Sequence, residues 1–234
     1  MKYIVEYQKW DTEFFKKKCC RATFFEKLTE EDFQQFLKEI EGFDFITIDN
    51  KCGDFYNCYL LSQCGAILSD CPMQFVKEIN DTDETFIDKN EVKIAEKSEA
   101  KVLAEIASNA FVCSRFANDP LISEEEFNKL YSSWVENAFD KNNKIVFTTE
   151  KLEGFLIAGF EGQKCYIDLI AVALASRNKN IGTSLIMAAE KVAKEKGCTQ
   201  YLVGTQSANI SAINLYIKSG FHVCDASQIF HIHR

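Results

Sequence analysis

The segment from Val172 to Thr183 contains residue types that suit a phosphate-binding turn. The apolar run before it, residues 166–172, predicts a buried strand, and the amphipathic run after it, residues 181–196, predicts a helix. The first N–H groups of a helix lack intrahelical partners, and the helix dipole favours an anion there. Arg177 adds a planar, permanently charged group that binds phosphate well. This segment therefore predicts binding of a phosphate-bearing ligand.

The elements that must position this turn are predicted from hydrophobic periodicity and turn residues. In the second half of the chain we expect strands at 92–95, 144–149, 152–160, 164–172, 200–206 and 221–231, with helices at 98–107, 123–139, 181–196 and 211–219. In the first half we expect strands at 3–7, 20–26, 43–50 and 73–79, with helices at 29–40 and 55–63. Short turns between residues 144 and 172 predict antiparallel hairpins, which disfavours a parallel mononucleotide-binding fold.

The overall composition excludes some classes of partner. The chain has 234 residues, 47% of them hydrophobic, and a net charge of −8. An acidic chain argues against a nucleic-acid partner, and no apolar stretch has the length of a membrane span. Its ten cysteines include no Cys-x-x-Cys pair, which predicts reduced, buried thiols and a cytoplasmic protein.

His231 and His233 are the candidate metal ligands. On a strand, residues two apart point to the same face, so the two imidazoles would lie together. No third ligand is near them in the sequence. We therefore predict no metal site.

Two ordered motifs resemble the GNAT N-acetyltransferase family. The family's acetyl-CoA loop, Val-x-x-x-x-[Arg/Gln]-x-x-Gly-x-[Gly/Ala], is matched by Val172, Arg177 and Gly182, with Asn180 in place of the first glycine. Asparagine tolerates a left-handed backbone, so the loop is expected to keep its shape. Residues 209–221 resemble the family's Asn-x-x-Ala-x-x-Leu-Tyr-x-x-x-Gly-Phe. The element order agrees with this fold.

A narrower resemblance, to TDP-fucosamine acetyltransferases, involves four further segments. These are residues 10–15, 114–116, 131–137 and 204–209. It implies a GNAT fold with a mixed, mostly antiparallel sheet flanked by helices, after a smaller N-terminal α/β domain. We expect residues 1–82 to form that domain, as a wall on the acceptor side, and residues 83–234 to form the acetyltransferase domain. The boundary falls in the polar segment 80–90. A homodimer is also implied.

The resemblance implies acetyl-CoA as co-substrate, held at one continuous site. The expected binding residues are Leu169, Ile170, Ala171, Val172, Arg177, Asn178, Lys179, Asn180, Ile181, Gly182, Thr183, Asn209 and Tyr216. The turn would bind the pyrophosphate, and the strand edge would pair with the amide-rich pantetheine arm.

The resemblance also implies that Tyr216 is the general acid that protonates the departing thiolate. A tyrosine on a helix is otherwise more often a core residue. Asn209 would cap that helix or contact the cofactor. The base is not evident from the sequence. Asp168 is a candidate because its strand parity places it with Ile170 and Val172, and the alternative is a solvated strand carboxylate.

The acceptor residues are the least determined. Trp10, Asp11, Phe14 and Phe15 would line a sugar-nucleotide cleft or form a core between domains. Arg115 would contact the acceptor's diphosphate or a structural carboxylate.

Three functions remain open at this point. The first is acetyl transfer to the amino group of a nucleotide-activated amino-dideoxy sugar. The second is transfer to another small amine, an amino acid or a protein N-terminus. The third, prompted by Asn180, is a non-catalytic acyl-CoA-binding module.

Overall fold

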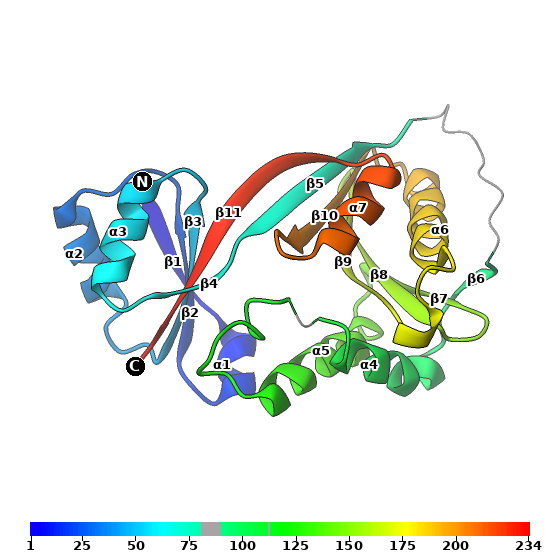
Figure 1. Ribbon diagram of the computed structural model, residues 1–234, viewed down its shortest axis with the longest axis horizontal. Helices are drawn as coiled ribbons and strands as arrows, with labels where there is room; N and C mark the ends of the chain where they lie inside the picture. Colours follow the sequence, from blue (N-terminus) through cyan, green and yellow to red (C-terminus); the bar gives the residue numbers. More distant parts are fainter. Residues whose placement is uncertain (81–89, 112) are drawn as a thin grey trace.

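The structure, a computed structural model, describes residues 1–80, 90–111 and 113–234. Its elements form two units joined by long strands (Figure 1). The first contains β1 (Tyr3–Tyr7), α1 (Lys9–Phe15), β2 (Cys19–Phe24), α2 (Glu30–Glu39), β3 (Phe45–Lys51), α3 (Phe55–Gln63) and β4 (Ile67–Asp70). The second contains β5 (Pro72–Glu78), β6 (Val92–Ile94), α4 (Ala100–Ser108), α5 (Glu124–Ala138), β7 (Lys144–Thr149), β8 (Gly154–Glu161), β9 (Lys164–Val172), α6 (Ile181–Glu195), β10 (Gln200–Gln206) and α7 (Ile210–Lys218).

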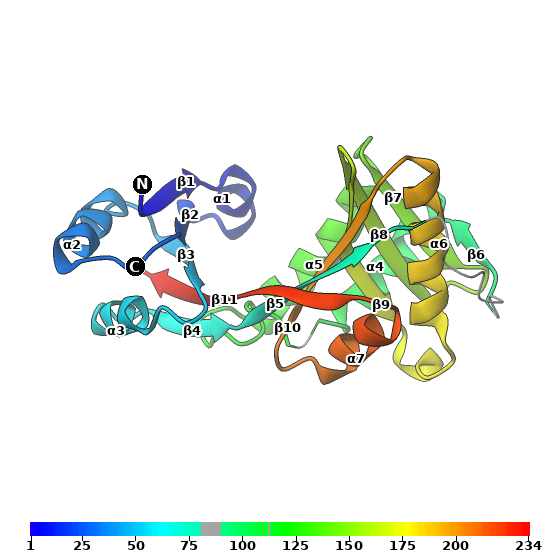
Figure 2. The ribbon, with the colours of Figure 1, turned by 90° about the horizontal axis from the view of Figure 1, so that it is seen from above.

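The final strand, β11 (His222–His233), belongs to both units. It pairs antiparallel with β5 at its start and with β3 and β4 toward its end. The strand order is β1-β2-β3-β11-β5-β10-β9-β8-β7-β6, with β4 beside β11. Figure 1 shows β11 and β5 running side by side from one unit to the other, and Figure 2 shows the same connection from above. The predicted mixed, mostly antiparallel sheet flanked by helices is confirmed.

The division at residue 82 stays a prediction. Strand pairs join residues on the two sides of this boundary. Strand β5, before it, pairs with β10 and β11, and residues 227–233, after it, pair with β3. Most of the expected linker, residues 81–89, lies outside the described residues.

Three apolar clusters hold these layers together. One packs α4 and α5 on one face of β7–β9, and a second packs α6 and α7 on the other face. The third lies between α2, α3 and the strands of the smaller unit. The first cluster also includes Cys19 and Phe45 of the smaller unit, so the two units share buried apolar surface. The burial of such surface contributes about 25 cal/mol per Å².

Local capping explains where two helices begin. At α2, Thr29 and Asp32 form a reciprocal capping box, and at α5 Ser123 and Glu126 do the same. Both starts follow the sequence prediction. Helix α1 and strand β4 were not predicted, because elements of seven and four residues carry little periodicity.

All ten cysteines of the chain carry free thiols, as expected. Only Cys19, Cys20, Cys165 and Cys198 are buried, whereas Cys52 and Cys224 are exposed, so the expectation of general burial is wrong. In the part of the chain that the structure describes, no helix is long and apolar enough to cross a membrane.

Candidate active site

Strands β9 and β10 run side by side only over their first residues. Their parallel register extends from Lys164 opposite Gln200 to Ile167 opposite Val203. Strand β9 then continues to Val172 and β10 to Gln206, with no further pair between them among the described residues. Because buried backbone groups need partners, the facing edges of residues 168–172 and 204–206 are suited to an extended, amide-containing ligand.

A β-bulge marks the point where the two strands separate. In the β8–β9 register, Ala158 lies opposite Ile167 and Ile157 lies opposite Leu169, which leaves Asp168 as the extra residue. A bulge reverses side-chain parity beyond it. Leu169 packs in the α4–α5 cluster, whereas Ile170 packs against the α6–α7 cluster.

Asp168 is therefore not on the face that strand alternation predicted. Its carboxylate forms an ion pair with Lys144 Nζ at 3.0 Å and lies against Gly159, which is paired with Lys144 across β7 and β8. This is the α4–α5 side of the sheet, because Val146, two residues along β7, belongs to that cluster. The expectation that Asp168 shares a face with Ile170 and Val172 is wrong because of the bulge.

The turn before α6 has the geometry of an anion site. Asn178 and Asn180 adopt left-handed φ values of 64° and 63°. The carbonyl of Asn180 accepts the first helical hydrogen bond from Ser184 N–H at 3.0 Å. The N–H groups of the first helical turn, at residues 181–183, consequently lack intrahelical acceptors. The expectation that Asn180 preserves a glycine-like backbone is confirmed.

The two basic residues of the turn are placed differently. Arg177 is exposed, and its Nε donates a hydrogen bond to the Val172 carbonyl at 3.4 Å. Lys179 lies 3.5 Å from Glu153 Oε1, and that carboxylate also accepts a 2.8 Å hydrogen bond from Ser176. The Ser176 hydroxyl and the nearby Lys179 ammonium lower the pKa of Glu153. Arg177 is thus the more available cation for a phosphate.

Gly182 is explained by packing. A Cβ at this position would lie 3.0 Å from Leu215 Cδ2, so glycine allows α6 and α7 to approach closely. This contact places the start of α6 beside α7, which carries Tyr216.

Tyr216 is almost fully buried, with 3% of its surface exposed, and packs against Phe75 and Phe221. Burial raises the pKa of Tyr216 above its ordinary value, so the phenol stays protonated near neutral pH. Asn209 is the N-cap of the same helix, and its Oδ1 accepts from Ala212 N–H at 3.2 Å. The predicted capping role of Asn209 is confirmed.

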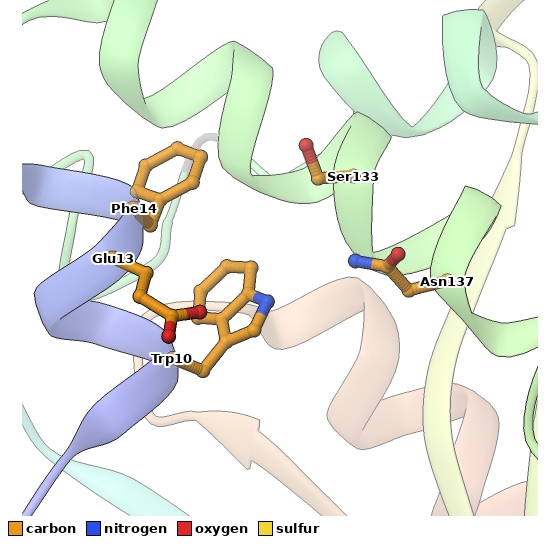
Figure 3. Close-up of a pocket in the computed structure, with 5 residues that line it drawn as sticks. All are labelled: Trp10, Glu13, Phe14, Ser133 and Asn137. Atoms are coloured by element: carbon orange, nitrogen blue, oxygen red, sulfur yellow. The ribbon is translucent and has the colours of Figure 1, made fainter.

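Trp10 and Phe14 line a small pocket between α1 and α5. Their rings stack at 5.1 Å, and Trp10 also lies 6.1 Å from Trp134. The pocket has a volume of about 220 Å³ and is lined by Trp10, Glu13, Phe14, Ser133 and Asn137. In Figure 3 the Trp10 indole and the Asn137 amide point toward one another across it.

The neighbouring Phe15 has a structural position. It packs edge-on against Phe45 at 5.4 Å and lies 5.9 Å from Phe116, inside the cluster shared by the two units. Phe15 therefore takes part in the core between the units, while a role of Trp10 and Phe14 in acceptor binding stays a prediction.

Arg115 lies in a half-buried cluster of charges. Its guanidinium stacks over Phe116 at 4.4 Å. The charges that act on it include Arg21 of β2, Asp11 of α1 and Asp70 at the end of β4. Burial raises the pKa of Asp11, while Arg115 opposes that rise. A diphosphate or an ammonium group entering this region would meet partners of opposite charge.

Asp70 is a candidate functional residue that sequence reasoning missed. It is the last residue of β4, and Pro72 two residues later pairs with Gln206 at the end of β10. Burial raises the pKa of Asp70, and the nearby Gln206 side chain opposes that rise. The carboxylate therefore lies beside the separated end of β10, a position that no sequence signal indicated.

His231 and His233 meet a third side chain that the sequence did not place near them. Asp119 Oδ2 lies 2.6 Å from His231 Nδ1 and 2.7 Å from His233 Nε2. Burial opposes ionisation of Asp119, but the two imidazole hydrogen bonds outweigh it and lower its pKa to about 2. The expectation that the pair has no third partner is wrong, because the loop before α5 folds onto β11.

Comparisons with known proteins define the class. The profile described as the Acetyltransferase (GNAT) family matches residues 107–221, which include the separated strands, the turn before α6 and Tyr216. Residues 107–221, just under half of the chain, are thus similar to the GNAT acetyltransferase family.

Solved structures share this fold. A GCN5-related N-acetyltransferase from Sphaerobacter thermophilus aligns with a TM-score of 0.65 at 10% identity, over 99% of this chain and 76% of its own. The PaiA N-acetyltransferase of Thermoplasma acidophilum, solved in complex with coenzyme A, aligns with a TM-score of 0.50 at 19% identity, over 62% of this chain and 98% of its own.

Two curated relatives are similar in sequence. The spore coat polysaccharide biosynthesis protein SpsD of Bacillus subtilis is 26% identical over 58% of this chain and 48% of its own length. A dTDP-fucosamine acetyltransferase of Escherichia coli O6:H1 is 28% identical over 56% of this chain and 58% of its own. The chain thus matches only about half the length of these relatives.

Proposed function

We propose that this protein transfers an acetyl group from acetyl-CoA to the amino group of a nucleotide-activated amino-dideoxy sugar. The observation that carries the proposal is the separation of β9 from β10 beside the start of α6 and the buried Tyr216, all within the residues similar to the GNAT family. The names of the two curated relatives support a sugar as the acceptor class.

In this proposal the donor occupies the backbone-rich side of the site. The pyrophosphate of acetyl-CoA accepts hydrogen bonds from the N–H groups of residues 181–183 and forms an ion pair with Arg177. The pantetheine arm pairs with β9 at residues 169–172 and places the thioester where β9 and β10 separate. Holding the donor in this way would remove much of the entropic cost of the reaction.

The chemical step is a direct transfer in a ternary complex. The lone pair of the neutral amine attacks the thioester carbonyl carbon, so that a C–N bond forms and the C–S bond breaks. The nitrogen then loses one proton to a base, and the sulfur takes one proton from the Tyr216 hydroxyl. The low-dielectric surroundings of Tyr216 would also disfavour an unprotonated thiolate.

Two carboxylates are candidates for the base. Asp168 lies at the bulge but is paired with Lys144. Asp70 lies beside Gln206, and its raised pKa brings it closer to the value a general base needs at neutral pH. We therefore favour Asp70 and retain Asp168 as the second candidate.

The acceptor would enter from the side of the smaller unit. Arg115 would bind its diphosphate as a planar fork, and the stacked Trp10 and Phe14 would contact an aromatic or sugar ring. These residues come from α1 and from the loop before α5, so both units would contribute to recognition.

Purified protein with acetyl-CoA and a panel of amines tests this function. TDP- and UDP-linked 4-amino-dideoxyhexoses should release free thiol and gain an acetyl group by mass spectrometry. Amino acids, polyamines and peptides should not react. Turnover restricted to one of the latter classes would instead support transfer to another small amine, which the partial coverage of the curated relatives favours as the alternative.

A further inference from the structure

The cluster of Asp119, His231 and His233 lies outside the machinery proposed above. Asp119 lies in the loop before α5, and the two histidines lie at the C-terminal end of β11. Their candidate ligand atoms all lie within 4.8 Å of one another. We propose that these three residues bind a divalent transition-metal ion, with zinc as the expected ion.

The chemical types of the donors support this assignment. Imidazole nitrogen and carboxylate oxygen are ligands that zinc accepts, at about 2.0–2.2 Å. Two neutral imidazoles and one carboxylate leave a net positive charge on the bound ion. Such a site suits an ion that retains a water molecule as its fourth ligand.

The donors are held on a rigid frame. His231 pairs with Thr47 and His233 with Phe45 in the β3–β11 register, so both imidazoles project from the same face. The Phe45 ring contacts both imidazoles, with centroid distances of 4.9 Å and 4.8 Å. The other carboxylate oxygen of Asp119 accepts from Leu121 N–H at 2.9 Å, which directs Oδ2 toward the histidines.

The cluster is almost closed to solvent. The side chains of His231 and Asp119 have no exposed surface. Buried charges in proteins are generally paired or bound to a metal, so a buried carboxylate that faces two imidazoles suits a metal site. The opposite ring nitrogens, His231 Nε2 and His233 Nδ1, are buried without a hydrogen-bond partner and would not be the ligand atoms.

Metal binding requires a change of tautomer and a shift of the ligand atoms. Each imidazole would carry its proton on the outer nitrogen and turn the lone pair of the inner nitrogen toward the metal. The oxygen–nitrogen separations of 2.6 and 2.7 Å would open to about 3.3 Å, and the two inner nitrogens, which lie within 4.8 Å of each other, would take the same spacing of tetrahedral ligands. His233 keeps 12% of its side chain exposed, which gives an ion a route to the site.

Zinc titration of chelator-treated full-length protein tests the proposal, with a competing zinc indicator to report free metal. We expect one equivalent to bind to the wild type. Binding should weaken at least about tenfold in His233→Gln and in Asp119→Asn, since each removes one ligand. His222→Gln changes an exposed histidine at the start of the same strand and should bind like the wild type.

Cobalt substitution supplies an independent readout, because the chain has ten cysteines. The cobalt-loaded protein should show ligand-field bands of nitrogen and oxygen ligands without thiolate charge-transfer absorption. Circular dichroism of each metal-free variant checks that it folds, and the two ligand variants serve as alternatives to each other. Absence of binding to the wild type, unchanged binding in both ligand variants, or a thiolate spectrum would each overturn the proposal and leave the cluster as a hydrogen-bonded clamp.

Discussion

The turn at residues 177–183 is built from one continuous stretch of chain, whereas the charged cluster around Arg115 takes its members from α1, β2, β4 and the loop before α5. The first region would bind its ligand mainly through backbone N–H groups at a helix start. The second would act through side chains brought together by the fold. A local backbone site leaves a motif in the sequence, while a site assembled from distant segments leaves only separate residues.

The largest effect is expected in Tyr216→Phe, on the helix that packs beside the first region. Removal of the hydroxyl should lower kcat by about a hundredfold or more, because the thiolate would leave without a proton donor. The ring packing against Phe75 would be preserved, so stability and affinity for acetyl-CoA should change little. Thiol-release kinetics, with calorimetry for acetyl-CoA, measure both. Unchanged kcat would assign Tyr216 to the core alone.

Asp70→Asn should be nearly as damaging if the acceptor side supplies the base. Burial raises the pKa of Asp70, so its ionised, proton-accepting form is lost as pH falls through that raised value. For wild type, kcat/KM should therefore rise with pH through this pKa. In Asp70→Asn the rate should fall by at least about tenfold and this limb should disappear.

Asp168→Asn is the matched control for that profile. It removes a carboxylate at the β9 bulge that is already paired with Lys144. A retained pH limb in this variant would support Asp70 as the base. Loss of the limb in Asp168→Asn, with its retention in Asp70→Asn, would reverse the assignment.

Arg115→Gln should separate acceptor binding from donor binding. The KM for the nucleotide sugar should increase by about tenfold, since a charge-assisted hydrogen bond is lost, while the KM for acetyl-CoA should not change. Arg177→Gln should show the opposite pattern. Steady-state kinetics with each substrate varied in turn measure this crossover, and equal effects on both substrates would mean that the two regions are not distinct.

The smallest effect is expected at Asn180, where the backbone conformation matters more than the side chain. Asn180→Val should weaken acetyl-CoA binding several-fold and destabilise the fold by about 1–2 kcal/mol, because a branched residue resists a φ of 63°. Asn180→Gly should bind at least as well as the wild type. Calorimetry and thermal unfolding measure both, and equal behaviour of the two variants would show that this backbone conformation is unimportant.

Features set by one continuous stretch of sequence could be predicted, whereas contacts between distant segments could not. The starts of α2 and α5 follow from Thr29 and Ser123 with an acid three residues later, because capping is local. The bulge at Asp168 could not be predicted, since strand alternation carries no mark of an inserted residue, and it moved a candidate base to the other face. Asp70 and Asp119 gain their neighbours only through β5–β10 pairing and through the loop that contacts β11.

In the proposed function, acetyl-CoA lies between the separated ends of β9 and β10, with its diphosphate at the start of α6. Amide hydrogen exchange with and without saturating coenzyme A tests this most directly. We predict slower exchange at residues 181–183 and at those residues of 168–172 whose N–H groups face β10, because these groups would gain acceptors, and little change in β1–β3 of the smaller unit. Binding of coenzyme A that leaves exchange at both segments unaltered would contradict the account.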